Sequence, residues 1–238
     1  RQTLFFSATI ESSVAHLVNV HLKNPVRIAI GSTTKPVAQI DLRVYEVGQD
    51  RKLSLLETML RHESGSFLVF ARTKRGCDRL AKKLAQGGAR AAAIHGDRTQ
   101  SQRNNALRGF QQGDYRVLVA TDVASRGIHV DGIAHVVNYD LPQAPEDFIH
   151  RVGRTGRAGV TGVATTFATP SDIGEIRRIE QLLGSRLVRR PLPAGLEAEP
   201  KHSAPVIVMP AKRVPPARAA KSYPSGLRVR RKRAQGGR

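Results

Sequence analysis

From about Leu42 onward, short apolar runs alternate with amphipathic stretches. The runs are rich in β-branched and alanine residues with little polar alternation, which is typical of strands covered on both faces. Between them, apolar residues recur at helical spacing, as they do in 53–60. This pattern predicts an α/β fold with a parallel, doubly wound sheet and helices on both faces. The predicted strands are 43–47, 66–70, 91–94, 116–120, 134–138 and 162–168. The predicted helices lie near 50–62, 74–86, 99–112, 145–152 and 172–183.

The first thirty residues do not follow this rhythm. They predict a strand at 3–6, a helix at about 12–22 and a strand at 26–30, and three such elements cannot bury their own apolar faces. We therefore expect 1–35 to be the end of a preceding domain plus a linker, and the chain to be a piece of a longer protein. The second domain is predicted to span 36–185. In 186–238, Pro and Ala accumulate and charge is high, which predicts disorder.

The charge balance narrows the choice of partner. The chain has 39 Lys and Arg against 19 Asp and Glu, a formal net charge of +20. Such a surplus favours a polyanionic partner, nucleic acid before an anionic membrane. Eleven of these cations and no acid lie in 201–238, so a nucleic-acid-binding arm and a merely solubilising tail are both open.

The remaining composition bears on compartment. Cys77 is the single cysteine, which excludes an internal disulfide and fits a reducing, cytoplasmic setting. No apolar run is as long as the ~18 residues of a membrane span. We expect no membrane contact and a monomer.

Polar residues follow the predicted strands at the points where the strands end. Arg72-Thr73, His95-Gly96 and Thr121-Asp122 stand there, and the carboxyl ends of parallel strands share one edge of a sheet, where ligands bind. The hydroxyls of Thr73 and Thr121 and the charges of Arg103 and Arg126 suit phosphate groups. Such contacts read a nucleic-acid backbone without reading its sequence. Each Thr could equally be a helix N-cap.

The segment 150–157 carries the most specific pattern. Three arginines alternate with glycines in His-Arg-Val-Gly-Arg-Thr-Gly-Arg, just after a predicted helix. Guanidinium groups bind phosphate oxygens in pairs, and glycines let the backbone approach a ligand. A solvated basic turn is the plain alternative.

This segment resembles the HRxGRxGR motif of DEAD-box ATP-dependent RNA helicases of superfamily 2. Further stretches resemble that family's motifs III to VI in order. They are Ser7-Ala8-Thr9, 67–74 (FLVFARTK), His95-Gly96-Asp97, Gln100–Arg103 (QSQR), 117–129 (VLVATDVASRGIH) and 136–142 (VVNYDLP). The resemblance covers residues 1 to about 185 and implies the second RecA-like (P-loop NTPase-type) domain of such an enzyme.

The resemblance also assigns roles. Arg154 and Arg157 would reach the γ-phosphate of ATP as catalytic residues, with Arg157 as the arginine finger. Residues for ATP binding and coupling would be His150, Arg151, Gly153, Gly156, Asp122, Gly127, His129, Ser7 and Thr9, with Asp122 orienting the network rather than acting as a base. Residues for RNA binding would be Thr73, Gly96, Gln100, Arg103, Thr121 and Arg126.

Two features depart from a complete enzyme of this kind. Family members usually carry Asp where this chain has His129, so a ribose contact and an uninvolved surface histidine are both open. The sequence also lacks a GxxxxGK[ST] loop and an Asp-Glu-Ala-Asp stretch. The resemblance thus implies that ATP and Mg²⁺ are held mainly by a preceding RecA-like domain and that this chain alone is inactive. A DNA helicase and a non-catalytic RNA-binding or RNA-chaperone module are the alternatives to an enzyme that unwinds short RNA duplexes.

Overall fold

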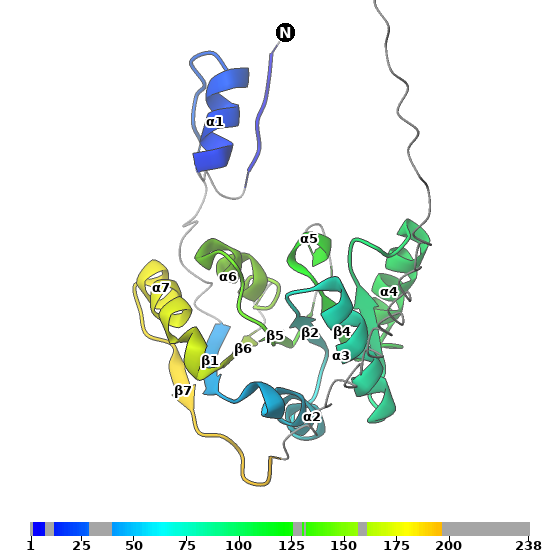
Figure 1. The fold of residues 1–238 in the computed structure, drawn as a ribbon. Helices are drawn as coiled ribbons and strands as arrows, with labels where there is room; N and C mark the ends of the chain where they lie inside the picture. The colour runs from blue at the N-terminus through cyan, green and yellow to red at the C-terminus, as the bar shows by residue number, and fades with distance from the viewer. Residues whose placement is uncertain are drawn as a thin grey trace, which may run out of the picture. The chain divides into compact units, whose positions relative to one another are not determined.

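The computed structural model describes residues 2–7, 12–28, 40–125, 130, 132–156 and 161–196 (Figure 1). From residue 40 onward the described chain forms a seven-stranded sheet in the order β3-β4-β2-β5-β6-β1-β7. Every pair of neighbouring strands is parallel, as the sequence predicts. The strands are β1 (Ile40–Glu46), β2 (Phe67–Phe70), β3 (Ala91–Ile94), β4 (Val117–Ala120), β5 (His135–Asn138), β6 (Gly162–Ala168) and β7 (Val188–Arg190).

Helices cover both faces of this sheet and divide the core into two layers. In β2, Phe67 and Val69 join the layer under α2 and α3, whereas Leu68 and Phe70 join the layer under α4, α6 and α7. Both faces of the central strand are therefore apolar, which explains the unbroken run in the sequence. The helices are α2 (Lys52–His62), α3 (Lys74–Gln86), α4 (Gln100–Gln112), α5 (Asp122–Ser125), α6 (Pro145–Val152) and α7 (Ile173–Leu183), with 3-10 turns at η1 (Gln49–Arg51) and η2 (Pro170–Asp172).

The six predicted strands and five predicted helices are confirmed, but the expected domain end at residue 185 is wrong. The chain continues into β7, which pairs with β1 through Arg43 and Val188, and Leu187 is buried in the core. The side chains of β7 are exposed, so its three residues show no apolar alternation that could have predicted it. The four-residue helix α5 was also missed. Residues 197–238 lie outside the described residues.

The amino-terminal segment forms one helix, α1 (Ser12–His21), close to the predicted 12–22. Residues 3–6 and 26–28 belong to no strand, although strands were predicted at 3–6 and 26–30. A strand needs a neighbour to accept its backbone hydrogen bonds, and the described segment supplies none. Leu4, Phe6, Val26 and Ile28 are each more than two thirds exposed. This apolar surface is consistent with a segment that packs against a domain outside this chain.

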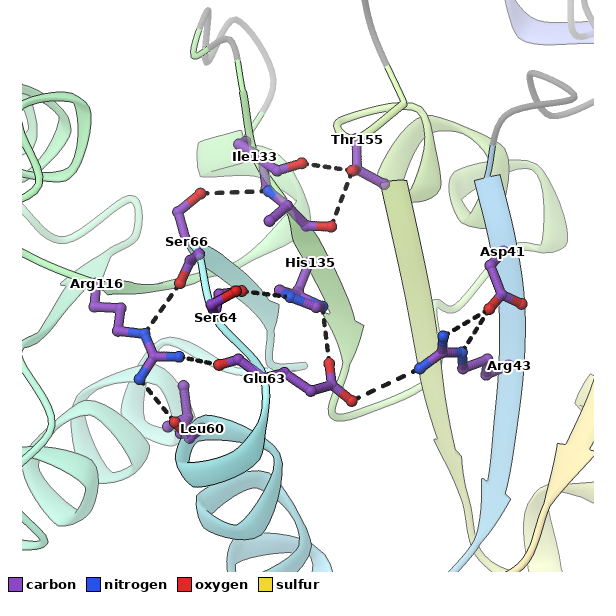
Figure 2. A network of polar contacts seen from close by, with 12 residues as sticks. Asp41, Arg43, Leu60, Glu63, Ser64, Ser66, Arg116, Ile133, His135 and Thr155 are labelled. Carbon is purple, nitrogen blue, oxygen red and sulfur yellow. Dashed lines mark hydrogen bonds and ion pairs between the residues drawn. The ribbon is translucent and has the colours of Figure 1, made fainter. Parts of the chain in front are cut away.

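At the amino ends of the strands, a partly buried polar network joins α2, β4 and β5, and Arg43 of β1 lies 3.7 Å from Glu63 (Figure 2). His135 lies 3.0 Å from a carboxylate oxygen of Glu63 through Nδ1, and its Nε2 lies 2.8 Å from the carbonyl oxygen of Ser64. A carbonyl oxygen only accepts hydrogen bonds, so Nε2 donates to Ser64, and Nδ1 can donate to Glu63 only when both ring nitrogens carry a hydrogen. Arg116 donates to the carbonyl oxygens of Leu60, Glu63 and Gly65 and so closes the end of α2.

This network makes stability depend on acid pH. The hydrogen bond from His135 lowers the pKa of Glu63 below its ordinary value of 4.5. Because the folded pKa lies below the unfolded one, the paired carboxylate stabilises the fold above pH 4.5 and loses this effect as pH falls through the folded pKa.

We expect Glu63→Gln to lower the free energy of unfolding by about 1 kcal/mol at neutral pH and by much less near pH 3. Urea unfolding across this pH range measures the difference. Glu57→Gln, on the same helix, is the control. Its difference from the parent in free energy of unfolding should not shrink between neutral pH and pH 3. A constant deficit for Glu63→Gln at all pH values would contradict the assignment.

Candidate functional site

The carboxyl ends of the central strands lie level, which builds the rim that the sequence predicts. Ala120 of β4 is in register with Phe70 of β2 and with Ile94 of β3, and Phe70 is in register with Asn138 of β5. Arg72-Thr73, His95-Gly96 and Thr121-Asp122 therefore follow three neighbouring strands at one edge. A fourth strand contributes Asp140, which the sequence reading did not include.

Arg151, on the last turn of α6, is the centre of this edge. Its Nε and Nη2 donate to the two carboxylate oxygens of Asp122 at 2.5 and 2.8 Å. Its Nη1 donates to the carbonyl oxygen of Asp140 at 2.6 Å and to Oδ1 of Asn138 at 3.2 Å. The guanidinium also lies 4.9 Å from the centre of the Phe70 ring. The orienting role of Asp122 stays a prediction.

The sequence places Arg151 among the residues for ATP binding and coupling, and that role stays a prediction. The residue is only 2% exposed, and its guanidinium is used within the domain. A buried guanidinium must be paired on all sides to offset its desolvation, and here Asp122, Asn138 and Asp140 do so. Arg151 thus acts by fixing Asp122 at the rim. Nothing in the sequence pattern distinguishes such an arginine from an exposed one.

A second buried cation supports the neighbouring part of the rim. Lys52, at the start of α2, donates to the carbonyl oxygen of Tyr139 at 2.7 Å and lies 3.6 Å from the carboxylate of Asp140. That carboxylate also accepts from the backbone N–H of Arg72 at 2.9 Å. Burial lowers the pKa of Lys52, and the charge of Asp140 opposes this shift. Asp140 therefore ties the loop after β2 to the end of β5.

The loop that follows α6 is held against the sheet. The Thr155 hydroxyl donates to the carbonyl oxygen of Ile133 and, at 3.3 Å, to that of Ala134. A Cβ at Gly162, the first residue of β6, would lie 2.0 Å from the Thr155 hydroxyl oxygen, so only glycine fits there. Gly156 has φ +67°, a conformation that favours glycine. The fold thus fixes the backbone that follows Arg154.

The other predicted ATP and coupling residues are placed only in part. Gly153 ends α6, and its N–H donates to the carbonyl oxygen of Ile149 at 2.9 Å. His150 and Arg154 are half-buried, one in α6 and one just after it. Ser7 belongs to the separate amino-terminal segment. The predictions for Thr9, Arg126, Gly127, His129 and Arg157 lie outside the described residues.

Of the predicted RNA-binding residues, Thr73 caps the amino end of α3, and Gln100 and Arg103 lie in the first turn of α4. Thr73 accepts from the N–H of Gly76 at 3.0 Å, so the helix-cap interpretation is confirmed for this residue. In the first turn of α4, Arg103 donates to Gln100 at 3.4 Å. Neither helix has an acid in its first turn. Thr121 is buried, whereas Thr73 and Gly96 are exposed.

The described ranges contain no candidate metal site and no candidate membrane span. No group of three His, Cys, Asp or Glu side chains in these ranges is placed to hold a metal ion. No helix there is both long and apolar enough to cross a bilayer.

Comparison with known proteins agrees with this geometry. Residues 51–159 match the family described as helicase conserved C-terminal domain. The chain is 41% identical over 199 residues to the DEAD-box ATP-dependent RNA helicase CshA of Geobacillus kaustophilus. The aligned residues make up 83% of this chain and 43% of that protein. It is 44% identical over 169 residues to the ATP-dependent RNA helicase vasa of Drosophila melanogaster. This alignment covers 71% of this chain and 26% of that protein. The chain spans less than half the length of these curated relatives.

Solved structures give the same result. The C-terminal domain of the DEAD-box protein Dbp5 superimposes with a TM-score of 0.59 at 31% identity, over 63% of this chain and 89% of that one. Dbp5 of S. cerevisiae bound to RNA and ADP BeF3 gives a TM-score of 0.70 at 29% identity, over 78% and 50%. The sheet and its rim thus define a helicase C-terminal domain with the RecA-like fold. The chain belongs to the DEAD-box family of ATP-dependent RNA helicases.

The central ion pair gives a direct test of the site's construction. Replacing Arg151 by Met leaves the Asp122 carboxylate without its main partner and should lower the free energy of unfolding by about 3 kcal/mol. Denaturant unfolding of the chain measures this loss. Arg177→Met, at an exposed position of α7, should change stability by no more than about 0.5 kcal/mol. Equal stability of the two variants would show that the pair contributes little to the fold.

Proposed function

We propose that this domain, in the whole protein, binds the backbone of one RNA strand at the rim and supplies arginines to ATP held by the preceding domain. The observation that carries the proposal is the buried contact of Arg151 with Asp122. This contact joins two elements. One is α6, which leads into the arginine loop (residues 153–157), and the other is the end of β4, which is followed by Thr121. A movement of either element is therefore transmitted to the other, as coupling between ATP and RNA requires.

The RNA part of the proposal rests on the chemistry of the rim. Thr73, Gln100 and Arg103 offer hydroxyl, amide and guanidinium groups near the amino ends of two helices, and phosphate groups bind well at such ends. The nearest atom to a Cβ at Gly96 would be Cε of Lys74 at 3.6 Å, an ordinary contact. Packing therefore does not demand glycine there, and close approach of a ligand backbone explains it. The solved complex of Dbp5 with RNA and ADP BeF3 supports this reading by similarity.

The ATP part rests on Arg154 and, from the sequence, Arg157. The backbone around Arg154 is fixed by Thr155 and Gly156, so its guanidinium is carried on a rigid support. Arginines aimed at a γ-phosphate stabilise charge that grows in the transition state. His150, on the same helix turn as Arg151, would contact the preceding domain. Mg²⁺, bound by that preceding domain, would neutralise phosphate charge.

Unwinding follows from closure of the two domains around ATP and RNA. A strand bound along one rim and bent on closure cannot keep its partner paired, so short duplexes separate. The chain by itself would bind RNA weakly and would not hydrolyse ATP. We further propose that the protein works as a monomer in the cytoplasm.

The catalytic assignment is tested by Arg157→Ala in the full-length enzyme. We expect RNA-stimulated ATP turnover at saturating ATP and RNA to fall by ~10³-fold, equivalent to ~4 kcal/mol, with the fold intact. Arg154→Ala should behave similarly, and Arg157→Lys should recover little because an ammonium cannot form the paired hydrogen bonds. Arg103→Ala should instead weaken RNA binding. Turnover of Arg157→Ala within a few-fold of the parent would assign the arginine finger elsewhere.

The basic tail is tested by deletion of 201–238, which removes eleven cations. We expect weaker RNA binding and a shallower dependence of affinity on salt, because each lost phosphate contact reduces the slope by about 0.7. Binding titrations at several salt concentrations measure both. The thermal midpoint of the remaining domain, which serves as the control, should hardly change. An unaltered salt slope would mean that the tail makes no phosphate contacts.

A further inference from the structure

The turn between β3 and α4, residues 95–98, carries Gly96 and leads directly into Gln100 and Arg103. Each of its three side chains contacts α3. Lys74 Nζ lies 2.5 Å from the Asp97 carboxylate. On the next turn of α3, one oxygen of Asp78 accepts from His95 Nε2 at 2.9 Å and from Arg98 Nη2 at 2.5 Å. The turn is thus held by α3 at both of its ends.

Asp78 is the shared acceptor of this arrangement. Its partner His95 is only 3% exposed, and a carboxylate can accept from Nε2 only if that nitrogen carries a hydrogen. Burial alone would raise the pKa of Asp78, but the hydrogen bonds from His95 and Arg98 outweigh it and lower the pKa. Asp78 is therefore ionised at neutral pH and binds both donors with charge-assisted hydrogen bonds.

Helix α3 is itself a rigid support. Cys77, Leu80, Ala81 and Leu84 anchor it in the core, and Thr73 caps its amino end at the rim. The helix therefore carries one candidate phosphate-binding group, Thr73, and holds the turn that carries the other. Among the ties between α3 and the turn described above, the Lys74–Asp97 pair would remain without the Asp78 contacts, and its side chains are both more than half exposed. Exposed pairs of this kind contribute little.

We propose that Asp78 is a positioning residue for RNA binding, which fixes the 95–98 turn so that Gly96, Gln100 and Arg103 meet the same RNA backbone as Thr73. This rests on the proposed function of the rim. Asp78 touches no RNA itself. It sets the distance between two contact points, so its loss weakens RNA binding without altering the arginine loop.

The test is Asp78→Asn in the full-length enzyme, with ATP turnover measured against RNA concentration. Asparagine keeps the shape of the side chain but cannot form two charge-assisted hydrogen bonds. We expect the RNA concentration for half-maximal turnover to rise about 10-fold, while turnover at saturating RNA stays within about two-fold of the parent. Asp114→Asn, an exposed carboxylate after the other end of α4, is the matched control and should change neither value. Arg103→Ala is measured beside them as the direct RNA contact.

The outcomes separate the two proposals. If Arg103→Ala raises the half-saturating RNA concentration and Asp78→Asn does so no more than Asp114→Asn, the positioning role is wrong and the proposed function stands. If Arg103→Ala also has no effect, the proposed RNA contact itself fails, and the positioning role with it. A fall in turnover at saturating RNA as large as the loss of RNA affinity would make Asp78 a merely structural residue.

A second pair of variants serves where Asp78→Asn does not fold. Arg98→Gln removes one of the two donors to Asp78, and Lys74→Gln removes the other tie to the turn. Both positions are more than one third exposed, so folding should be retained. We expect each to raise the half-saturating RNA concentration by a few-fold at unchanged maximal turnover, and the double variant to approach 10-fold. No change in the double variant would overturn the proposal.

Discussion

The site depends on one buried cation. The Arg151 guanidinium lies inside the domain, where an unpaired charge would cost several kcal/mol. Two carboxylate oxygens of Asp122, an amide oxygen of Asn138, a carbonyl oxygen of Asp140 and the Phe70 ring surround it. Because these partners come from β2, the end of β5 and the segment after β4, the arginine can be satisfied only when those elements are correctly aligned. The same requirement fixes the direction in which α6 leaves the sheet.

The two ends of the sheet are specialised. At the amino ends, His135, Glu63 and Arg116 form a closed network whose partners are mainly backbone carbonyl groups and each other. At the carboxyl ends, the charged groups Arg151 and Lys52 are paired inside the domain, and residues such as Thr73 and Gly96 remain exposed at the rim. Parallel sheets allow this separation because all strands end at the same edge. The first end stabilises the domain, and the second can carry ligand-binding groups.

Much of this organisation could be predicted from the sequence. The strands and helices are visible because their apolar runs match the burial they receive, as in β2 and β4, and the rim follows from where those runs end. β7 could not be found, because its pairing with β1 uses backbone groups while the side chains of Val188, Arg189 and Arg190 stay exposed. The burial of Arg151 and Lys52 was equally hidden, since a charged residue looks the same in sequence whether its partners are water or a distant carboxylate. The Asp78–His95 contact joins α3 to the turn after β3, and the sequence pattern gives no periodic signal for it.

The close fit of Gly162 against Thr155 has a further consequence. Thr155 belongs to the arginine-containing segment 150–157. Its hydroxyl donates to the carbonyl oxygens of Ile133 and Ala134, just before β5. The backbone that follows Arg154 is thus fastened to the sheet by contacts of the domain itself, and the conformational entropy of ordering it is lost during folding. Position 162 is thus restricted to glycine by packing inside the domain, because any side chain there would displace Thr155 and the backbone of Gly156.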